Sequence, residues 1–151
     1  MPWIIKYLWL IPALPMLAAG LSALAPQRAR KFSSGLAIGS MVISFLLALC
    51  AFSQALGHPG DKLVCNFDWF QFGDQWVQLG WMLDPLTAVM LVMVTFVGTL
   101  IFIYSTGYMS HDQNFTRFFT FLSLFAGERL GVVIANTWLL LFICWELVGI
   151  T

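Results

Sequence analysis

The sequence predicts an all-α integral membrane protein with about five transmembrane helices and one β-hairpin outside the bilayer. Of the 151 residues, 60% are hydrophobic and 9% are charged, against roughly 25% charged in an average soluble domain. Asp, Glu, Lys and Arg are absent from three long stretches: 21 residues between Lys6 and Arg28, 29 between Lys31 and Asp61, and 27 between Asp84 and Asp112. About 20 mostly apolar residues cross a hydrocarbon layer of about 30 Å. Each stretch therefore accommodates one span.

The remaining composition excludes several classes of partner and cofactor. Seven basic residues balance seven acidic ones, so no overall field attracts nucleic acid. The lipid bilayer is the expected surrounding. Cys50, Cys65 and Cys144 form no CxxC or Cys/His spacing, and we expect them to act as small apolar residues without a metal.

The first span is expected at about residues 3–24. Aromatic rings favour the headgroup boundary, so Trp3, Tyr7 and Trp9 mark one interface. Pro12 and Pro15 are acceptable in a spanning helix that packs against neighbours. A cleaved signal sequence is the alternative, but the apolar run is longer than a typical signal core and further spans follow it.

The second span is expected at about residues 32–56. A basic loop at 27–31 precedes it and the turn formers of residues 57–61 follow it. Gly35 and Gly39 form a GxxxG pattern, which permits close approach between helices.

Residues 63–83 alternate between apolar and polar side chains, which is the spacing of a strand. Phe70 and Phe72 flank Gln71, and Val77 and Leu79 flank Gln78. The intervening Gly73-Asp74 suits a tight turn with glycine first. The pattern predicts an amphipathic β-hairpin outside the bilayer, lying against the protein or the headgroups.

The last three spans are expected at about residues 84–108, 115–135 and 137–151. Asp84 followed by Pro85 is a typical helix start. Fifteen residues from Thr137 reach only about 22 Å, less than a full crossing. We therefore expect the fifth helix to be truncated at Thr151 and the chain to be a fragment, the amino-terminal part of one transmembrane domain over residues 1–151.

The basic residues predict the orientation. Arg28, Arg30 and Lys31 follow the first span and Arg117 begins the fourth, so both loops lie on one side. The positive-inside rule places that side in the cytoplasm. The chain is thus predicted to be a multi-pass protein of the cell inner (plasma) membrane, with its amino terminus and hairpin extracytoplasmic.

Glu146 is the leading candidate for chemistry. It is the tenth residue counted from Thr137, about 15 Å along the helix and near the bilayer midplane. An ionisable group there is expensive and indicates a functional site. A poorly hydrated carboxyl can hold or release a proton near neutral pH, as a proton relay requires. The alternative is a protonated glutamate that only bonds a neighbouring helix.

Secondary candidates are Glu128 and Arg129 in the fourth span. Adjacent helix positions do not face one another, so they are not expected to pair, and Arg129 is expected to snorkel outward. Either residue could instead meet a group on another helix. Asp84 is expected to be a helix cap, and His111 to lie solvated in a polar loop.

Five ordered motifs resemble one family, and the likeness extends from about Phe67 to Thr151. They are Asp84-Pro85-Leu86-Thr87, Val94-Thr95-Phe96-Val97-Gly98, Tyr104-Ser105-Thr106-Gly107-Tyr108-Met109, Arg117-Phe118-Phe119 and Trp145-Glu146-Leu147-Val148-Gly149. The set resembles the antiporter-like subunits of respiratory complex I. Its final motif is most similar to the subunit L (ND5-type) family of NADH:quinone oxidoreductase.

The resemblance implies a role for Glu146 as a proton-relay residue in the fifth helix. It also implies that NADH, FMN, iron–sulfur clusters and quinone belong to partner subunits, so this chain has no redox site of its own. Antiporter-like membrane subunits are the implied neighbours. No GxGxxG pattern or cysteine cluster opposes this interpretation.

The chain departs from the family at Gly127-Glu128-Arg129-Leu130-Gly131, where relatives usually carry uncharged residues. The helices that supply partner lysines would follow Thr151. Three alternatives stay open: a subunit of an Mrp-type sodium/proton antiporter, a subunit of an inorganic-carbon transporter, and a structural membrane scaffold.

Overall fold

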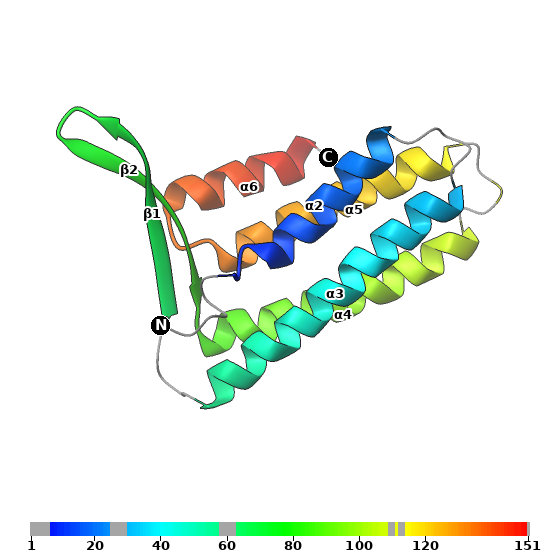
Figure 1. Ribbon diagram of the computed structural model, residues 1–151, viewed down its shortest axis with the longest axis horizontal. Coiled ribbons are helices and arrows are strands. Elements are labelled where there is room, and N and C mark those ends of the chain that lie inside the picture. The colour runs from blue at the N-terminus through cyan, green and yellow to red at the C-terminus, as the bar shows by residue number, and fades with distance from the viewer. Residues whose placement is uncertain (1–6, 25–29, 58–62, 109–110, 112–113, 151) are drawn as a thin grey trace.

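The computed structural model describes residues 7–24, 30–57, 63–108, 111 and 114–150 (Figure 1). Over these residues the chain forms five helices and one two-stranded antiparallel sheet. The elements are α2 (Leu10–Leu24), α3 (Arg30–Gly57), β1 (Leu63–Phe72), β2 (Gln75–Leu83), α4 (Pro85–Tyr108), α5 (Phe115–Ile134) and α6 (Trp138–Ile150).

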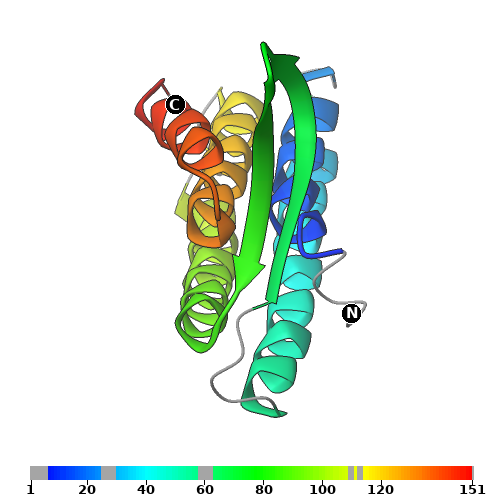
Figure 2. The same ribbon diagram turned by 90° about the vertical axis from the view of Figure 1, so that its left-hand side faces the viewer.

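The hairpin and four of the five helices lie close to the predicted ranges, but the first helix is shorter than predicted. Residues 7–9 form a turn and α2 begins at Leu10, because Pro12 has no N–H to donate to the Leu8 carbonyl. Residues 3–6 of the first expected span, most of the basic loop at 27–31 and most of the turn at 57–61 lie outside the described residues. The helices run side by side, with the hairpin at one end of the bundle and the α4–α5 connection at the other (Figure 1). Seen from its own side, the hairpin crosses the near ends of the helices (Figure 2).

Helices α3 and α4 are long and apolar enough to cross a membrane. Their mean hydropathies reach 2.3 over Lys31–Gly57 and 2.5 over Pro85–Tyr108, and 33% and 28% of their most apolar windows are buried. The core helix of a soluble protein would be mostly buried, so the outward apolar side chains indicate a membrane helix. Helices α2 and α6 are apolar but shorter, and α5 carries three charged residues.

The two prolines of α2 leave backbone carbonyls without their usual helical donors. Pro12 has no N–H to donate to the Leu8 carbonyl, which accepts a hydrogen bond from the Ile11 N–H at 3.1 Å. Pro15 likewise cannot donate to the Ile11 carbonyl, which accepts a hydrogen bond from the Ser44 hydroxyl of α3 at 3.0 Å. Helix α2 thus tolerates Pro15 because a neighbouring helix supplies the donor.

Close helix packing occurs at glycines other than the GxxxG pair. A Cβ atom added at Gly35 or Gly39 would meet nothing within 4 Å. A Cβ atom added at Gly127 of α5 would collide with Met16 and lie 2.8 Å from the carbonyl oxygen of Pro12 on α2. The absence of a side chain at Gly127 therefore lets α5 approach the backbone of α2.

Two groups of buried side chains form the core. One, towards the hairpin, comprises Leu8, Ile11, Ala48, Ala51, Leu83, Ala88, Leu91, Leu130 and Ile134. The other, towards the α4–α5 connection, comprises Ala37, Met41, Phe102, Phe115 and Phe119. The first group includes the last residue of β2, so the base of the hairpin is part of the helical core.

The hairpin has the predicted turn. Gly73 adopts a φ of 64°, a left-handed conformation that favours glycine at the first turn position. Asp68 pairs with Gln78 across the strands, and the Gln78 side chain donates a hydrogen bond of 2.8 Å to the Asp68 carboxylate. The register shifts between Asp68 and Phe70, which identifies a bulge at Trp69.

The base of the hairpin is joined to the connection between α5 and α6. Trp81 forms an antiparallel bridge with Ala135. The backbone N–H of Asn136 donates to the carbonyl of Gly80 at 3.0 Å, and its side chain donates to the Asn66 side chain at 2.8 Å. These contacts form the hairpin clamp, defined by Asn66, Gly80, Trp81, Ala135 and Asn136.

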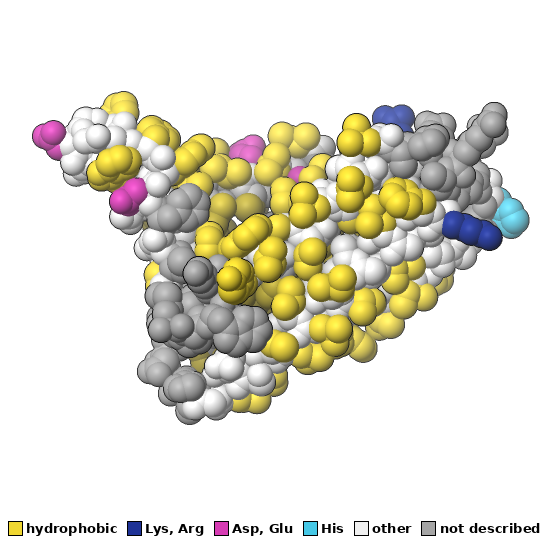
Figure 3. Space-filling view, in the orientation of Figure 1, with side chains coloured by type: hydrophobic (Ala, Val, Ile, Leu, Met, Phe, Trp, Pro, Cys, Tyr) yellow, Lys and Arg dark blue, Asp and Glu magenta, His cyan; other side chains and the backbone are white. Residues whose placement is uncertain are grey.

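Charged side chains lie mainly at the two ends of the visible face (Figure 3). Acidic side chains lie on the hairpin, and basic and histidine side chains gather at the opposite end. The flank between them is mainly apolar, with some acidic side chains within it. This distribution fits an apolar layer between two aqueous surfaces.

Candidate functional site

Helix α6 carries Glu146, and it begins at the predicted position. The backbone N–H of Leu140 donates to the Thr137 hydroxyl at 3.4 Å, and the N–H of Leu141 donates to the Thr137 carbonyl at 3.1 Å. Thr137 therefore caps the helix. Among the 13 residues of α6, Glu146 is the one charged residue. It lies eight residues after Trp138, about 12 Å along the helix.

The Glu146 side chain is exposed. It lines a shallow pocket of about 190 Å³ together with Trp145, Val148 and Gly149. A Cβ atom added at Gly149 would meet nothing within 4 Å, so the space beside this glycine is open. The described residues do not bury the carboxyl, and a poorly hydrated surrounding for it would have to come from lipid or from other helices.

The outer face of α6 is apolar and open. None of its residues is fully buried, and Trp138, Leu141, Phe142 and Trp145 line a second pocket of about 310 Å³. Trp138 is 86% exposed. Single exposed apolar residues are ordinary, but a contiguous apolar surface of this kind indicates contact with lipid or with another protein segment.

The contact between Gly131 and Cys144 sets the rotation of α6 against α5. A Cβ atom added at Gly131 would lie 2.7 Å from the Cys144 sulfur. Glu146 follows Cys144 by two residues, which is a rotation of about 200° around the helix axis. The Glu146 carboxyl therefore points away from α5.

Glu128 is the most deeply buried ionisable residue at the candidate site, with a relative exposure of 1%. It follows Gly127, which contacts α2, and its carboxyl is near enough to Cys144 for an electrostatic interaction. The structure therefore places Glu128 between α5 and its neighbours α2 and α6. Glu128 therefore approaches the side of α6 that carries Cys144, and Glu146 is on a different side of that helix.

Arg129 lies on a different side of α5 from Glu128. Its side chain is exposed, and the guanidinium carbon lies 5.0 Å from the centre of the Phe125 ring. The two adjacent charged residues thus point into different surroundings, as expected from helix geometry.

Asp84 and His111 have the positions expected of non-catalytic residues. The Asp84 carboxylate accepts a bond of 2.7 Å from the Thr87 N–H, three residues into the helix. This is the hydrogen bond of a helix cap. His111 is exposed in the connection between α4 and α5.

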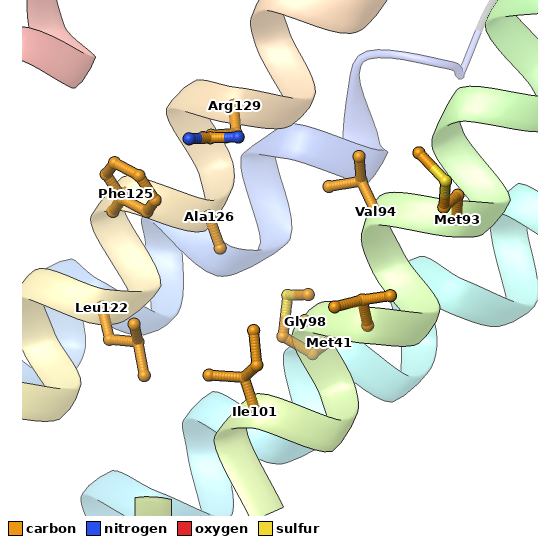
Figure 4. A pocket seen from close by; sticks show the side chains of 10 residues that line it. Met41, Met93, Val94, Gly98, Ile101, Leu122, Phe125, Ala126 and Arg129 are labelled. Carbon is orange, nitrogen blue, oxygen red and sulfur yellow. The ribbon is translucent and has the colours of Figure 1, made fainter.

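A groove between α4 and α5 was not predicted from the sequence. It has a volume of about 370 Å³ and includes Arg129 among its lining residues (Figure 4). Its residues come from three helices, and no local pattern in the sequence shows which faces of those helices meet. Among the described residues, no group of three or more His, Cys, Asp or Glu side chains could hold a metal ion.

Comparison with known proteins identifies the relatives of this chain. Residues 69–119 match the family model for NADH-ubiquinone oxidoreductase (complex I), chain 5 N-terminus. The chain is 40% identical over 152 residues to a protein of Mesostigma viride named NAD(P)H-quinone oxidoreductase subunit 5, chloroplastic. It is 38% identical over 152 residues to the protein of the same name from Zygnema circumcarinatum.

These alignments cover nearly all of this chain and a small part of each relative. The Mesostigma protein is matched over 95% of this chain and 23% of its own length, and the Zygnema protein over 95% and 21%. A third relative of the same name, from Chlorokybus atmophyticus, is 38% identical over 99% of this chain and 24% of its own length. Over nearly its whole length the chain is therefore similar to subunit 5 (ND5-type) proteins of complex I, and residues 69–119 match the family model that describes the N-terminus of chain 5.

Proposed function

We propose that the intact protein is a proton-translocating membrane subunit of an NADH:quinone oxidoreductase and that Glu146 relays protons within it. The observation that carries the proposal is the position of Glu146. It is the one ionisable residue of an apolar helix and lies about 12 Å from the start of that helix. A charged group is costly at such a depth. The names of the relatives support an oxidoreductase complex as its setting.

In this proposal the carboxyl exchanges protons while partner subunits carry out the redox chemistry. NADH, FMN, iron–sulfur clusters and quinone bind to those partners. The open apolar face of α6 would contact further helices of the same protein or antiporter-like neighbours. These contacts would exclude bulk water from Glu146, and exclusion of water favours the protonated carboxyl.

Replacing Glu146 by Gln in the intact protein tests the proposal. The Gln side chain has nearly the same size but cannot take up or release a proton. We expect NADH-driven proton uptake by membrane vesicles, measured by quenching of a pH-sensitive dye, to fall relative to NADH oxidation in the same vesicles. Glu146→Asp should retain more transport, and Asp74→Asn, in the exposed hairpin turn, serves as the control.

The same vesicles distinguish the other candidate functions. Unchanged proton uptake in Glu146→Gln would remove this residue from the mechanism and would favour a structural scaffold. Transport that requires sodium would favour an Mrp-type antiporter, and uptake of bicarbonate would favour an inorganic-carbon transporter.

A further inference from the structure

The groove between α4 and α5 has one charged end and an apolar interior. It is defined by Met41 of α3, by Met93, Val94, Val97, Gly98 and Ile101 of α4, and by Leu122, Phe125, Ala126 and Arg129 of α5. Among these described residues, Arg129 alone is charged. The volume of about 370 Å³ lies within the range of ligand pockets, roughly 300–1,000 Å³.

The two walls of the groove face one another across a gap that side chains do not close. Leu122 and Ala126 of α5 lie opposite Val94, Gly98 and Ile101 of α4 (Figure 4). Met41, which is fully buried, forms the floor, and a Cβ atom added at Gly98 would lie 2.6 Å from its terminal methyl group. The absence of a side chain at Gly98 therefore lets Met41 pack against α4 at the floor of the groove.

Arg129 is placed near the hairpin end of this groove. It precedes the end of α5 at Ile134 by five residues, about 7.5 Å. The apolar wall continues from Arg129 to Leu122, about 10 Å deeper along the same helix. In the structure the guanidinium carbon of Arg129 lies 5.0 Å from the centre of the Phe125 ring, which is one turn deeper along α5. An arginine side chain is long enough to extend from there towards the membrane surface when it binds a headgroup.

We propose that this groove binds an anionic phospholipid of the leaflet on the hairpin side. One acyl chain lies against the apolar walls, and the phosphate group accepts hydrogen bonds from Arg129. Guanidinium groups bind phosphate with two parallel hydrogen bonds. The charge complementarity between the phosphate and Arg129 favours this occupant over an uncharged lipid. The proposal rests on placement of the helices in a membrane and not on proton transport by Glu146.

Photolabelling of the full-length protein in phospholipid nanodiscs tests the site. The probe is phosphatidylglycerol with a photoreactive diazirine in one acyl chain, and the labelled peptides are located by mass spectrometry. We expect labelling of residues 93–101 and 122–126. In Arg129→Gln this labelling should fall roughly tenfold, which corresponds to about 1.4 kcal/mol of lost affinity. Arg129→Lys should retain part of it.

Arg117 provides a matched control. It is also exposed on α5, and its guanidinium carbon also lies near an aromatic ring, 5.7 Å from the centre of Phe121. It does not line the groove. Arg117→Gln should therefore leave the labelling unchanged. Ala126→Phe, which fills the groove while leaving Arg129 in place, should reduce it.

Three results would overturn the proposal. The first is wild-type protein without labelling in the groove, which would mean that another helix of the protein occupies it. The second is equal labelling in wild type and Arg129→Gln. The third is equal labelling by a diacylglycerol that carries the same diazirine but no phosphate.

Discussion

Single side chains determine how the proline-containing helix α2 is held in the bundle. Pro15 has no N–H group, and the carbonyl of Ile11 takes its hydrogen bond from Ser44 of α3 instead. Both groups are buried. A buried carbonyl without a donor lowers stability, so Ser44 is expected to matter more than the other serines of its helix.

Replacing Ser44 by Ala should lower the free energy of unfolding by about 1 kcal/mol, the scale of an interhelical hydrogen bond in a membrane. Unfolding in mixed micelles with increasing sodium dodecyl sulfate, followed by tryptophan fluorescence, measures the change. Ser53→Ala is the control, because Ser53 is exposed and bonds within its own helix to the carbonyl of Cys50.

A double substitution tests the assigned cause. With Pro15→Ala, a backbone N–H becomes available at position 15 and can serve the Ile11 carbonyl. Ser44→Ala should then cost close to nothing in that background. If Ser44→Ala lowered the free energy of unfolding equally with and without Pro15, Ser44 would act through packing and not through its hydrogen bond to the Ile11 carbonyl.

The sequence predicted the residues whose roles are local. Asp84 and Gly73 interact with backbone a few residues away, so their types and positions were sufficient to predict the helix cap and the turn. Ser44 and Glu128 depend on which helix lies beside them. The pairing of α2 with α3 and with α5 is set by tertiary packing, which no single segment of the sequence specifies.

At the scale of elements, the hairpin clamp connects two parts of the chain that are about 70 residues apart. The Asn66 side chain crosses β2 at Gly80 to reach Asn136. A Cβ atom added at Gly80 would overlap the Asn66 side chain and lie 3.0 Å from its Cα atom. Gly80 therefore allows the hairpin to join the start of α6, the helix that carries Glu146.

Replacing Gly80 by Ala should open the clamp. The opening of the clamp is measured by amide hydrogen exchange at Asn136, whose N–H donates to the Gly80 carbonyl. We expect exchange of this amide to be faster by roughly tenfold, or about 1.4 kcal/mol of local stability. Gly107→Ala, at a position where an added Cβ meets nothing within 4 Å, should leave it unchanged. Equal protection of Asn136 in both variants would contradict the clamp.

The sequence predicted the elements but not their contacts. Charge-free stretches predicted three of the helices, the apolar runs after them predicted the other two, and alternation of side chains predicted the hairpin. Each of these signals lies within one segment. The clamp and the α4–α5 groove depend on the meeting of separate segments. Helices α3 and α4 are apolar around most of their circumference, so their sequences do not indicate which face packs inward.

At the scale of the whole molecule, the hairpin and the carboxyl end of α4 lie at opposite ends of the bundle (Figure 1). His111 follows the end of α4 at Tyr108 by three residues. A bilayer that covers the apolar flank would separate these two ends. Under the positive-inside rule, the basic residues at the end remote from the hairpin predict that this end faces the cytoplasm, and the orientation stays a prediction.

Single cysteines test this orientation in a variant in which Cys50, Cys65 and Cys144 are replaced by Ala. Asp74→Cys in the hairpin turn and His111→Cys are both at exposed positions. In intact cells a membrane-impermeant maleimide should label the first and not the second, while opened cells should give labelling of both. Labelling of both positions in intact cells would exclude a bilayer between them.

Composition alone was sufficient to predict the membrane character of the molecule, because 60% hydrophobic residues in long blocks exceed what a soluble core can bury. The surrounding of Glu146 was not predictable in the same way. It depends on the segments that cover α6, and the chain spans 19–24% of the length of the relatives compared with it.

The close contact between Gly131 and Cys144 also bears on the rotation of α6 about its own axis. A helix that is apolar on nearly every side has little preference for one rotation about its own axis, so a close contact such as this one helps to fix the rotation of α6. A bulkier residue at position 131 would rotate α6 about its axis and move Glu146 towards a different neighbour. If Glu146 relays protons as proposed, that relay would then depend on a glycine that carries no charge.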